Sequence, residues 1–148
     1  MRATFPRVRN LVGVRIAFGT DEHLPLTEVI VGSLRDLGHE VVVDIEDEPW
    51  PDVGRRVGEA VAEGQADRGV VCCWTGTGVS IAANKVEGVR AALCTDAETA
   101  RGARRWNNAN VLALGLRLTS PTVAREMVEA FLATDADPGE AETIARVG

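Results

Sequence analysis

Short apolar runs alternate with amphipathic stretches along most of this sequence. Apolar runs that are rich in β-branched residues and closed by glycine or polar residues predict buried strands. They cover Val14–Phe18, Val41–Val43, Val70–Cys73, Val89–Cys94 and Asn110–Leu114. Between them, apolar residues recur every three or four positions, which predicts helices over about 26–37, 52–64, 79–85, 96–105 and 121–133, with a short helix within 138–147.

The alternation of strand and helix predicts the fold class. It indicates an α/β protein with a five-stranded parallel sheet and helices on both faces, which is a three-layer α/β/α sandwich. The strand segments are continuously apolar, as expected of strands buried on both sides. Residues 1–12 break the pattern with Pro6, Asn10 and several arginines. We therefore expect an N-terminal arm at 1–12 and a single domain at 13–148.

Composition narrows the class of protein. A chain of 148 residues, 45% apolar and 26% charged, fits one globular domain. Its net charge of −6 argues against a nucleic-acid partner, and no apolar run is long enough for a membrane partner. Three cysteines and two histidines, without a CxxC pair, indicate neither a disulfide framework nor a metal site. We expect a cytoplasmic protein with no metal and no cofactor.

Polar residues gather in segments where this fold class binds ligands. In open parallel sheets, ligands bind beyond the carboxyl ends of the strands. The candidate segments are 19–23, 73–80 and 106–110, of which the last follows a strand and its helix. The second is the most informative, because the sequence Thr-Gly-Thr-Gly at 75–78 forms a tight turn between a strand and a helix.

Cys73 and this glycine turn indicate proton-transfer chemistry. Successive backbone N–H groups at such a turn bind anions. A thiolate facing them suits removal of a proton next to a carbonyl, because the amides then hold the negative oxygen of an enediolate. The alternative is an ordinary strand-to-helix turn with a buried cysteine. The segment has neither the full GxGxxG of a dinucleotide site nor the GK[ST] of a Walker-type phosphate loop.

Three stretches resemble the type B ribose-5-phosphate isomerases, whose superfamily includes the galactose-6-phosphate isomerase subunits. They are CWTGTGVSIAANK at 73–85, GVRAALC at 88–94 and NNANVL at 107–112, and the similarity covers about 14–134. The resemblance implies a Rossmann-like sandwich and a homodimer, often paired further into tetramers, with active sites that draw on both subunits. It also implies cofactor-free aldose–ketose isomerisation through an enediolate.

By position, the resemblance assigns roles to individual residues. Cys73 matches the base that moves a proton between C1 and C2, and Asp21 matches an aspartate near the ring oxygen of the substrate. Asn107 matches an asparagine that touches substrate hydroxyls, and Arg117 an arginine that contributes to phosphate binding in some members. Thr75 and the turn amides match the anion hole, so the residues expected along the turn are Thr75, Gly76, Thr77, Gly78 and Ser80.

Other positions depart from the family pattern. Glu22 stands where the family has a histidine near the phosphate, with His23 one position later, and Trp106 replaces the ring-opening histidine. The C-terminal segment that carries phosphate-binding arginines in the family reads PGEAETIAR here. Because a phosphate dianion needs paired cations or many amides, we expect a substrate that lacks a phosphate or holds it elsewhere. Three arginines of one predicted helix have two interpretations, a substitute cationic patch for the phosphate or a solvated helix face. They are Arg101, Arg104 and Arg105.

The three tryptophans of the chain, Trp50, Trp74 and Trp106, all match positions that line the family's active site. Tryptophan faces pack against the C–H faces of sugars and bury them without charge. The alternative for each tryptophan is that it packs in the core or in an interface and does not contact a sugar. Trp74 replaces a glycine of the turn, and a tryptophan there is strained if the backbone needs a positive φ.

The leading hypothesis is a cofactor-independent aldose–ketose isomerase of a sugar or sugar phosphate other than ribose 5-phosphate, with Cys73 as base. A short open-chain ketose would need no ring opener. For a cyclic substrate, ring opening is either unassisted or done by another group, such as His23, Glu22 or Asp21. An epimerase is a close variant, because the enediolate can be reprotonated on its other face. The alternatives are a non-catalytic sugar- or metabolite-binding protein on the same fold, and an ordinary ribose-5-phosphate isomerase with displaced phosphate contacts.

Overall fold

The computed structural model describes residues 13–148, so the expected arm at 1–12 lies outside the described residues. Five strands form one parallel sheet in the order β2-β1-β3-β5-β4. They are β1 (Arg15–Thr20), β2 (Glu40–Ile45), β3 (Arg68–Cys73), β4 (Ala91–Leu93) and β5 (Val111–Gly115). Each strand overlaps the apolar run that predicts it.

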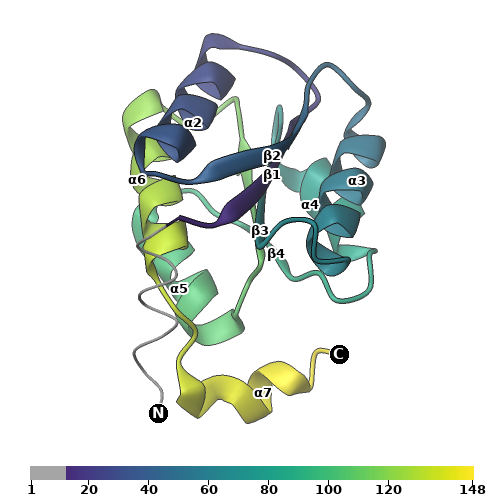
Figure 1. The fold of residues 1–148 in the computed structure, drawn as a ribbon, viewed down its shortest axis with the longest axis vertical. Helices are drawn as coiled ribbons and strands as arrows, with labels where there is room; N and C mark the ends of the chain where they lie inside the picture. Colours follow the sequence, from purple (N-terminus) through teal and green to yellow (C-terminus); the bar gives the residue numbers. More distant parts are fainter. Residues whose placement is uncertain (1–12) are drawn as a thin grey trace.

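Helices cover both faces of this sheet (Figure 1). One face carries α2 (Pro25–Asp36), α5 (Ala97–Asn107) and α6 (Pro121–Ala133), and the other carries α3 (Trp50–Ala62) and α4 (Thr77–Asn84). A 3₁₀ turn (Pro138–Glu140) and α7 (Ala141–Ala145) follow at the end of the sheet where the strands begin. The predicted α/β/α sandwich with five parallel strands is confirmed. Among residues 13–148, no helix is both long and apolar enough to cross a membrane.

Two apolar layers hold the sandwich together, one on each face of the sheet. Successive strand residues point to opposite faces. Cys72 therefore packs in the layer of Phe18 and Phe131, under α2 and α6, whereas Cys73 packs in the layer of Val53 and Val57, under α3. The Cys73 side chain thus lies on the face that α4 covers, directly before that helix begins.

The strand order creates a crevice between β1 and β3. The chain leaves β1 through α2 toward β2, and then crosses back through α3 to β3 on the other side of β1. The helices that follow these two neighbouring strands therefore lie on opposite faces of the sheet. Such a switch point opens a ligand-binding crevice at the carboxyl ends of the strands.

The strands and the main helices begin and end within two residues of the predicted bounds, and two of these differences lie near the candidate segments. α4 begins at Thr77 rather than Val79, because Gly76 takes a left-handed conformation (φ +80°) that turns the chain into the helix. β4 is three residues long, and Asn84 pairs with its outer edge. The Asn84 amide donates to the Ala91 carbonyl oxygen (2.9 Å), and the Asn84 side-chain oxygen accepts from the Ala91 N–H (2.8 Å). A side chain thus occupies part of the edge that a further strand would take.

Arg104 belongs neither to an exposed cationic patch nor to a solvated helix face. Its side chain is buried and donates to the carbonyl oxygens of Ala109 (2.6 Å) and Thr134 (2.9 Å). Its guanidinium also lies over the ring of Phe131. Burial lowers the pKa of Arg104 to about 9. The expectation for this residue is wrong, because its N–H donors satisfy buried carbonyl groups at the end of α5 and after α6.

Candidate active site

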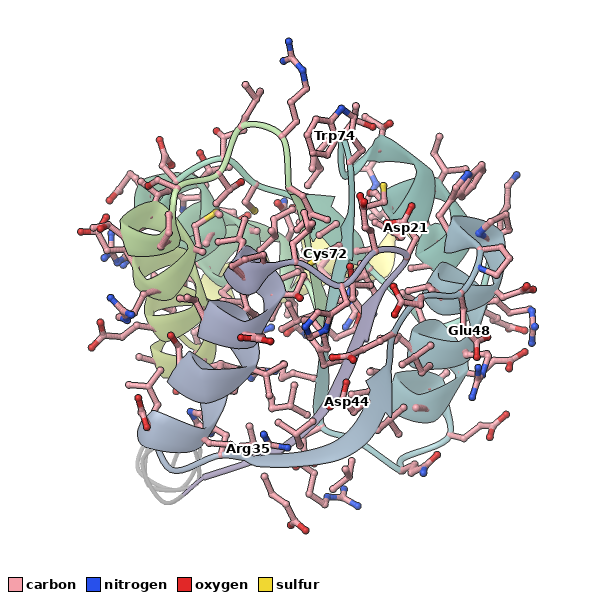
Figure 2. The ribbon with its side chains drawn as sticks, turned by 90° about the horizontal axis from the view of Figure 1, so that it is seen from above. Asp21, Arg35, Asp44, Glu48, Cys72 and Trp74 are labelled. Atoms are coloured by element: carbon pink, nitrogen blue, oxygen red, sulfur yellow. The ribbon has the colours of Figure 1, made fainter. Side chains whose placement is uncertain are left out.

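Asp21 and Cys73 lie at the crevice between β1 and β3. Asp21 follows β1 directly, and its backbone N–H donates to the Cys72 carbonyl oxygen (3.3 Å), so the pairing of the two strands extends to this residue. Cys73 is the last residue of β3. Figure 2 looks down on this end of the sheet, with Asp21 and Trp74 at the ends of the two strands. Two of the three candidate segments are therefore adjacent.

The turn after β3 brings a thiol to a row of backbone amides. The Gly76 N–H donates to the Cys73 Sγ at 3.2 Å. The first turn of α4 adds N–H groups that have no acceptor within the helix, those of Thr77, Gly78 and Val79. An N–H donor and a helix N-terminus both stabilise nearby negative charge. The turn at 73–80, called the Cys73 turn below, can therefore hold a thiolate and an oxyanion together.

Hydroxyl groups accompany these amides. The Thr75 and Thr77 hydroxyls hydrogen-bond each other at 2.8 Å, so both side chains lie on the same side of the turn. Ser80 lies one turn further along α4, where its backbone N–H donates to the Gly76 carbonyl oxygen (3.3 Å). Each of these hydroxyls can both donate to and accept from a polyhydroxy ligand.

Trp74 fits this turn without backbone strain. Within residues 13–148, the non-glycine residues with positive φ are Asp47 and Asn108, and the left-handed residue of the turn is Gly76. The strain considered for a tryptophan here therefore does not arise. The Trp74 side chain is 53% exposed, so its indole face is open to a ligand or a partner.

Trp50 and Arg117 border the same turn. A Cβ atom added to Gly78 would lie 2.9 Å from the Trp50 indole, so this ring covers the start of α4. The Arg117 N–H donates to the Trp74 carbonyl oxygen (2.9 Å), which lays the segment after β5 alongside the turn. One aromatic face and one cationic residue are thereby added to the amides and hydroxyls.

The Asp21 carboxylate is incompletely hydrogen-bonded. Its Oδ1 atom is buried and has no hydrogen-bond partner among the residues that the structure describes. Burial raises the pKa of Asp21, and the neighbouring Glu22 raises it further. A carboxyl group in this state is suited to exchange a proton with a hydroxyl or carbonyl oxygen of a ligand.

Glu22 and His23 take different places in the loop after β1. The Glu22 backbone pairs with the Thr20 hydroxyl, which donates to its carbonyl oxygen (2.8 Å) and accepts from its N–H (3.3 Å). The His23 ring lies between two carboxylates, with its nitrogens 2.8 Å from Glu28 and 3.1 Å from Glu46. No spacing in the sequence indicates this arrangement, because its three residues come from three different elements.

Trp106 and Asn107 lie away from Cys73 within one chain. α5 runs back against the strands, so its last residues lie beside the start of β5. Cys73 pairs at the other end of β5, about 13 Å away at 3.3 Å for each residue step. The expectation that 106–110 lies at the carboxyl end of the sheet is wrong, because a crossover helix returns the chain to the opposite end.

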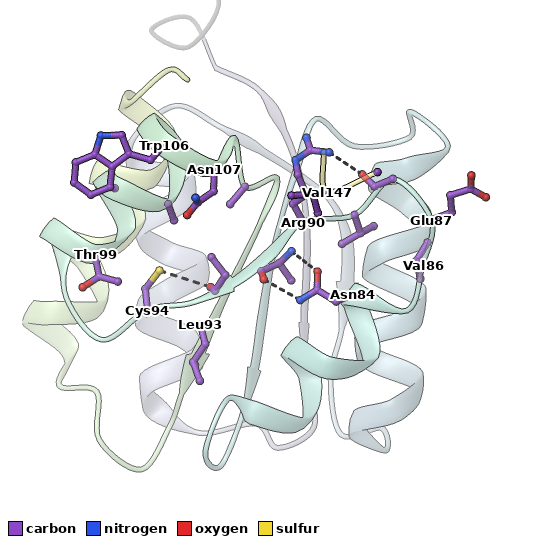
Figure 3. Close-up of a pocket in the computed structure, with 18 of the residues that line it drawn as sticks. Asn84, Val86, Glu87, Arg90, Leu93, Cys94, Thr99, Trp106, Asn107 and Val147 are labelled. Carbon is purple, nitrogen blue, oxygen red and sulfur yellow. Dashed lines mark hydrogen bonds between the residues drawn. The ribbon is translucent and has the colours of Figure 1, made fainter. Parts of the chain in front are cut away.

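These two residues line a separate hollow along β4 (Figure 3). The hollow has a volume of about 1110 Å³, and its wall includes Leu93, Cys94 and Thr99. Trp106 packs over Gly102 of its own helix and is 53% exposed. The candidate site of a single chain is therefore in two parts, the Cys73 turn with Asp21 and the end of α5.

Comparison with known proteins shows to which family the chain belongs. Residues 16–147 match the family described as ribose/galactose isomerase. The chain belongs to the ribose/galactose isomerase family. This match covers every helix named above and all of the strand residues except Arg15, the first residue of β1.

Relatives in the ribose/galactose isomerase family match the chain over most of their length. This chain is 38% identical over 130 residues to ribose-5-phosphate isomerase B of Escherichia coli. The aligned stretch covers 84% of this chain and 87% of that protein. The chain is 37% identical over 141 residues to a D-erythrulose-4-phosphate isomerase of Pectobacterium atrosepticum, with 90% and 92% covered. The type B ribose 5-phosphate isomerase of Trypanosoma brucei superposes with a TM-score of 0.82 at 37% identity, over 91% of this chain and 97% of that one. The chain is therefore an isomerase of a sugar phosphate isomerase family, with the Rossmann-like fold of the type B enzymes.

Proposed function

We propose that the chain is a cofactor-independent aldose–ketose isomerase in which Cys73 is the base. The observation that carries this proposal is the Cys73 Sγ, 3.2 Å from the Gly76 N–H, at the crevice where the Asp21 Oδ1 has no hydrogen-bond partner among residues 13–148. A base, an anion-binding turn and a proton carrier are the groups that an enediolate mechanism needs. A non-catalytic sugar-binding protein would have no use for a thiol at this turn.

The reaction moves one proton between two carbons and another between two oxygens. The Cys73 thiolate takes the proton from the carbon beside the carbonyl, and the C–H electron pair forms the double bond of the enediolate. The α4 N–H groups hold the resulting oxyanion. Cys73 then returns its proton to the former carbonyl carbon. Asp21, whose pKa is raised by burial, carries the second proton from one substrate oxygen to the other.

The substrate that fits best is a four-carbon ketose phosphate. The Pectobacterium atrosepticum relative is named for D-erythrulose 4-phosphate. The carbonyl of this ketose is at C2, so none of its hydroxyls can close a five- or six-membered ring. In the product aldose, the C4 oxygen that could close a five-membered ring is esterified. Such a substrate needs no ring opener, which agrees with Trp106 at the position that the resemblance assigns to the ring-opening histidine. This reading favours the open-chain option over ring opening by another residue.

The border of the Cys73 turn offers contacts for such a substrate. Arg117, beside the Trp74 carbonyl group, supplies a cation for the phosphate. In the same chain, Glu140 and Glu142 lie at the opposite end of the sheet, around α7 (Figure 1). They therefore do not repel a phosphate held at this chain's own turn. Within one chain, the cation proposed for the phosphate is therefore Arg117 and not a residue of the C-terminal segment.

Hydrogen exchange in heavy water tests the reaction and the substrate together. The protein is incubated with D-erythrulose 4-phosphate, D-erythrulose or ribose 5-phosphate, and deuterium at C1 and C2 is followed by NMR. We expect exchange in D-erythrulose 4-phosphate to be at least about tenfold faster than in the other two, because the site binds its phosphate and needs no ring opening.

Each of the other possible results would favour a different function. Faster exchange in ribose 5-phosphate would favour the ordinary family activity with displaced phosphate contacts. Exchange confined to unphosphorylated D-erythrulose would contradict the phosphate contact assigned to Arg117. Absence of exchange, with binding still detected by tryptophan fluorescence, would favour a sugar-binding protein. Inversion at the exchanged carbon would make the enzyme an epimerase.

We propose further that a second copy of this chain completes the site. The end of α5 is about 13 Å from Cys73 within one chain, whereas the resemblance places Asn107 and Trp106 against the same substrate as Cys73. In a two-fold dimer each copy can supply its α5 end to the Cys73 turn of the other. Exposed apolar side chains support such an interface: Trp74, Ile81, Leu93 and Trp106. Pairing of two dimers into a tetramer would leave this arrangement unchanged.

Mixing two inactive variants tests the shared site. Cys73→Ala and Asn107→Ala are each expected to be nearly inactive as homodimers. In a mixed dimer one site contains both substitutions and the other contains neither. After subunit exchange we therefore expect about a quarter of the unmodified activity, since half of the dimers are mixed and each has one intact site. Activity that stays at the level of the separate variants would place both residues in one subunit's site.

The remaining partners and the compartment follow from the same chemistry. The proposed reaction needs only protons that the substrate, Cys73 and Asp21 exchange, so no metal or organic cofactor enters it. The three cysteines are free thiols, which suits the reducing cytoplasm. We propose a cytoplasmic enzyme whose partners are a small carbohydrate and a second copy, and neither nucleic acid nor a membrane.

A further inference from the structure

His23 joins two loops that border the Cys73 turn. Its Nε2 atom lies 2.8 Å from the Glu28 Oε2, and its Nδ1 atom lies 3.1 Å from the Glu46 Oε1. Its backbone N–H donates to the Asp47 Oδ1 at 3.0 Å. Glu28 belongs to α2, whereas Glu46 and Asp47 belong to the loop between β2 and α3. His23 thus links the loop after β1 to the loop after β2 through two contacts, and to α2 through the third.

Each linked loop carries a residue of the proposed active site. Asp21 lies two positions before His23. The Thr20 hydroxyl, on the other side of Asp21 in the sequence, hydrogen-bonds the Glu22 backbone and so fixes this loop. Trp50 begins α3 at the end of the second loop and covers the start of α4 at Gly78. Connections this short transmit displacements, because each residue step spans only about 3.5 Å. A change in the His23 contacts therefore reaches Asp21 through one loop and Trp50 through the other.

We propose that His23 is a positioning residue of the active site rather than a ligand of the sugar. By bridging two carboxylates, it holds the loop of Asp21 and the loop of Trp50 against the Cys73 turn. Both ring nitrogens face protein carboxylates, so neither is left for the substrate. The inference rests on the proposed function, because these positions matter to catalysis only if the Cys73 turn is the active site.

The complete bridge needs the charged form of the ring. Only the imidazolium donates from both nitrogens, whereas a neutral ring turns a lone pair toward one of the carboxylates. Its surroundings are acidic, apart from one arginine that faces Asp44. The charged groups on the elements that pack around the ring are Glu28 and Arg35 of α2, Asp44 of β2, and Glu46 and Asp47 of the following loop. Loss of the ring proton therefore leaves carboxylates from two elements without their shared cation.

The pH range of the bridge follows from these contacts. Hydrogen bonding to Glu28 raises the pKa of His23 above its ordinary value of 6.5, partial burial opposes this, and Glu46 raises it further. Because the pKa is higher in the folded protein than in the unfolded chain, the bridge is fully present below about pH 6.5. It is lost as the pH rises through the folded-state pKa. Activity that depends on the bridge should fall on the alkaline side over the same range.

The bridge can be measured without any substrate. The chain has two histidines, so ring NMR signals of the full-length protein report both titrations. His39, whose pKa is lowered by burial, serves as the internal reference. In a Trp74→Phe, Trp106→Phe variant, Trp50 is the only tryptophan, and its fluorescence reports the second loop. We expect this fluorescence to change with the His23 midpoint, to lose that change in His23→Gln, and to shift to a lower midpoint in Glu46→Gln.

Activity then separates positioning from substrate binding. With D-erythrulose 4-phosphate, His23→Gln is expected to lower kcat about tenfold with little change in KM, and to remove the alkaline limb of the pH profile. His39→Gln is the matched control. His39 lies at the other end of the sheet, where it accepts a hydrogen bond from the Val14 N–H that a glutamine oxygen can also accept. This control should keep the alkaline limb.

The two measurements fail in different ways. If the Trp50 fluorescence does not follow His23, the positioning role is overturned whatever the activity. A rise in KM at unchanged kcat in His23→Gln would also overturn it, and would make His23 a ligand of the sugar. If the Trp50 fluorescence follows the His23 titration but the unmodified protein isomerises none of the sugars tested, the link between the loops stands and the proposed function fails.

Discussion

Replacing Cys73 with alanine is expected to lower kcat for isomerisation by about a thousandfold, the usual contribution of a general base. The substitution removes the sulfur that takes the proton from carbon, while the Gly76 N–H and the start of α4 stay in place to bind the substrate oxygen. KM should therefore change much less than kcat. Cys73→Ser should be similarly inactive, because a hydroxyl is a far weaker acid than a thiol and has no adjacent base. Hydrogen exchange by NMR, with circular dichroism to confirm folding, measures the effect.

Cys72→Ala is the matched control for this prediction. Cys72 is the preceding residue of the same strand, fully buried on the opposite face of the sheet. Burial raises the pKa of its thiol far above the ordinary range, so it cannot act as a base. We expect a loss of about 1 kcal/mol in the free energy of unfolding, from the small cavity, with kcat retained. Equal losses of kcat in both variants would indicate a structural effect, and unchanged turnover in Cys73→Ala would remove this residue as the base.

Local periodicity and topology are enough to predict the Cys73 half of the site. Continuous apolar runs indicate a parallel sheet, and a parallel sheet places the residues after its strands at one edge. Strand alternation then separates Cys72 from Cys73. The placement of Asp21 beside β3 needed the strand order, which the structure supplies as a switch point between β1 and β3.

The remaining placements differ in what predicts them. Trp106 and Asn107 follow a strand and its helix, and a crossover helix returns the chain to the end of the sheet where the strands begin, so the order of the elements itself predicts this placement. Arg104 looks like part of an exposed basic row, but its partners are carbonyl oxygens from other segments. His23 likewise contacts carboxylates from two further elements. The placements of Arg104 and His23 are fixed by long-range packing, so residue type and local pattern alone could not predict them.

Gly76→Ala should give the second large effect, a loss of about 3 kcal/mol in the free energy of unfolding. Gly76 has a φ of +80°, which an L side chain rarely adopts. An added Cβ would also lie 2.6 Å from the Leu93 Cδ1 and 2.8 Å from the carbonyl carbon of Leu114. The leucine side chain can move aside, but the backbone of β5 cannot, so the turn must shift. Because the Gly76 N–H is the donor to Cys73, we expect this shift to lower kcat at least about a hundredfold.

Gly64→Ala separates the conformational cost from the contact with β5. Gly64 has a similar φ of +84°, but a Cβ there would meet nothing within 4 Å. Alanine at Gly64 should therefore cost only the left-handed conformation, about 1 kcal/mol, and leave kcat unchanged. Denaturant unfolding and kcat of both variants measure the difference, which reports how firmly β5 holds the Cys73 turn. If Gly76→Ala lost no more stability than Gly64→Ala and kept its turnover, the turn could relax without moving its amides. The thiol and the anion-binding N–H groups would then not depend on one rigid turn, and the case for Cys73 as base would lose its geometric support.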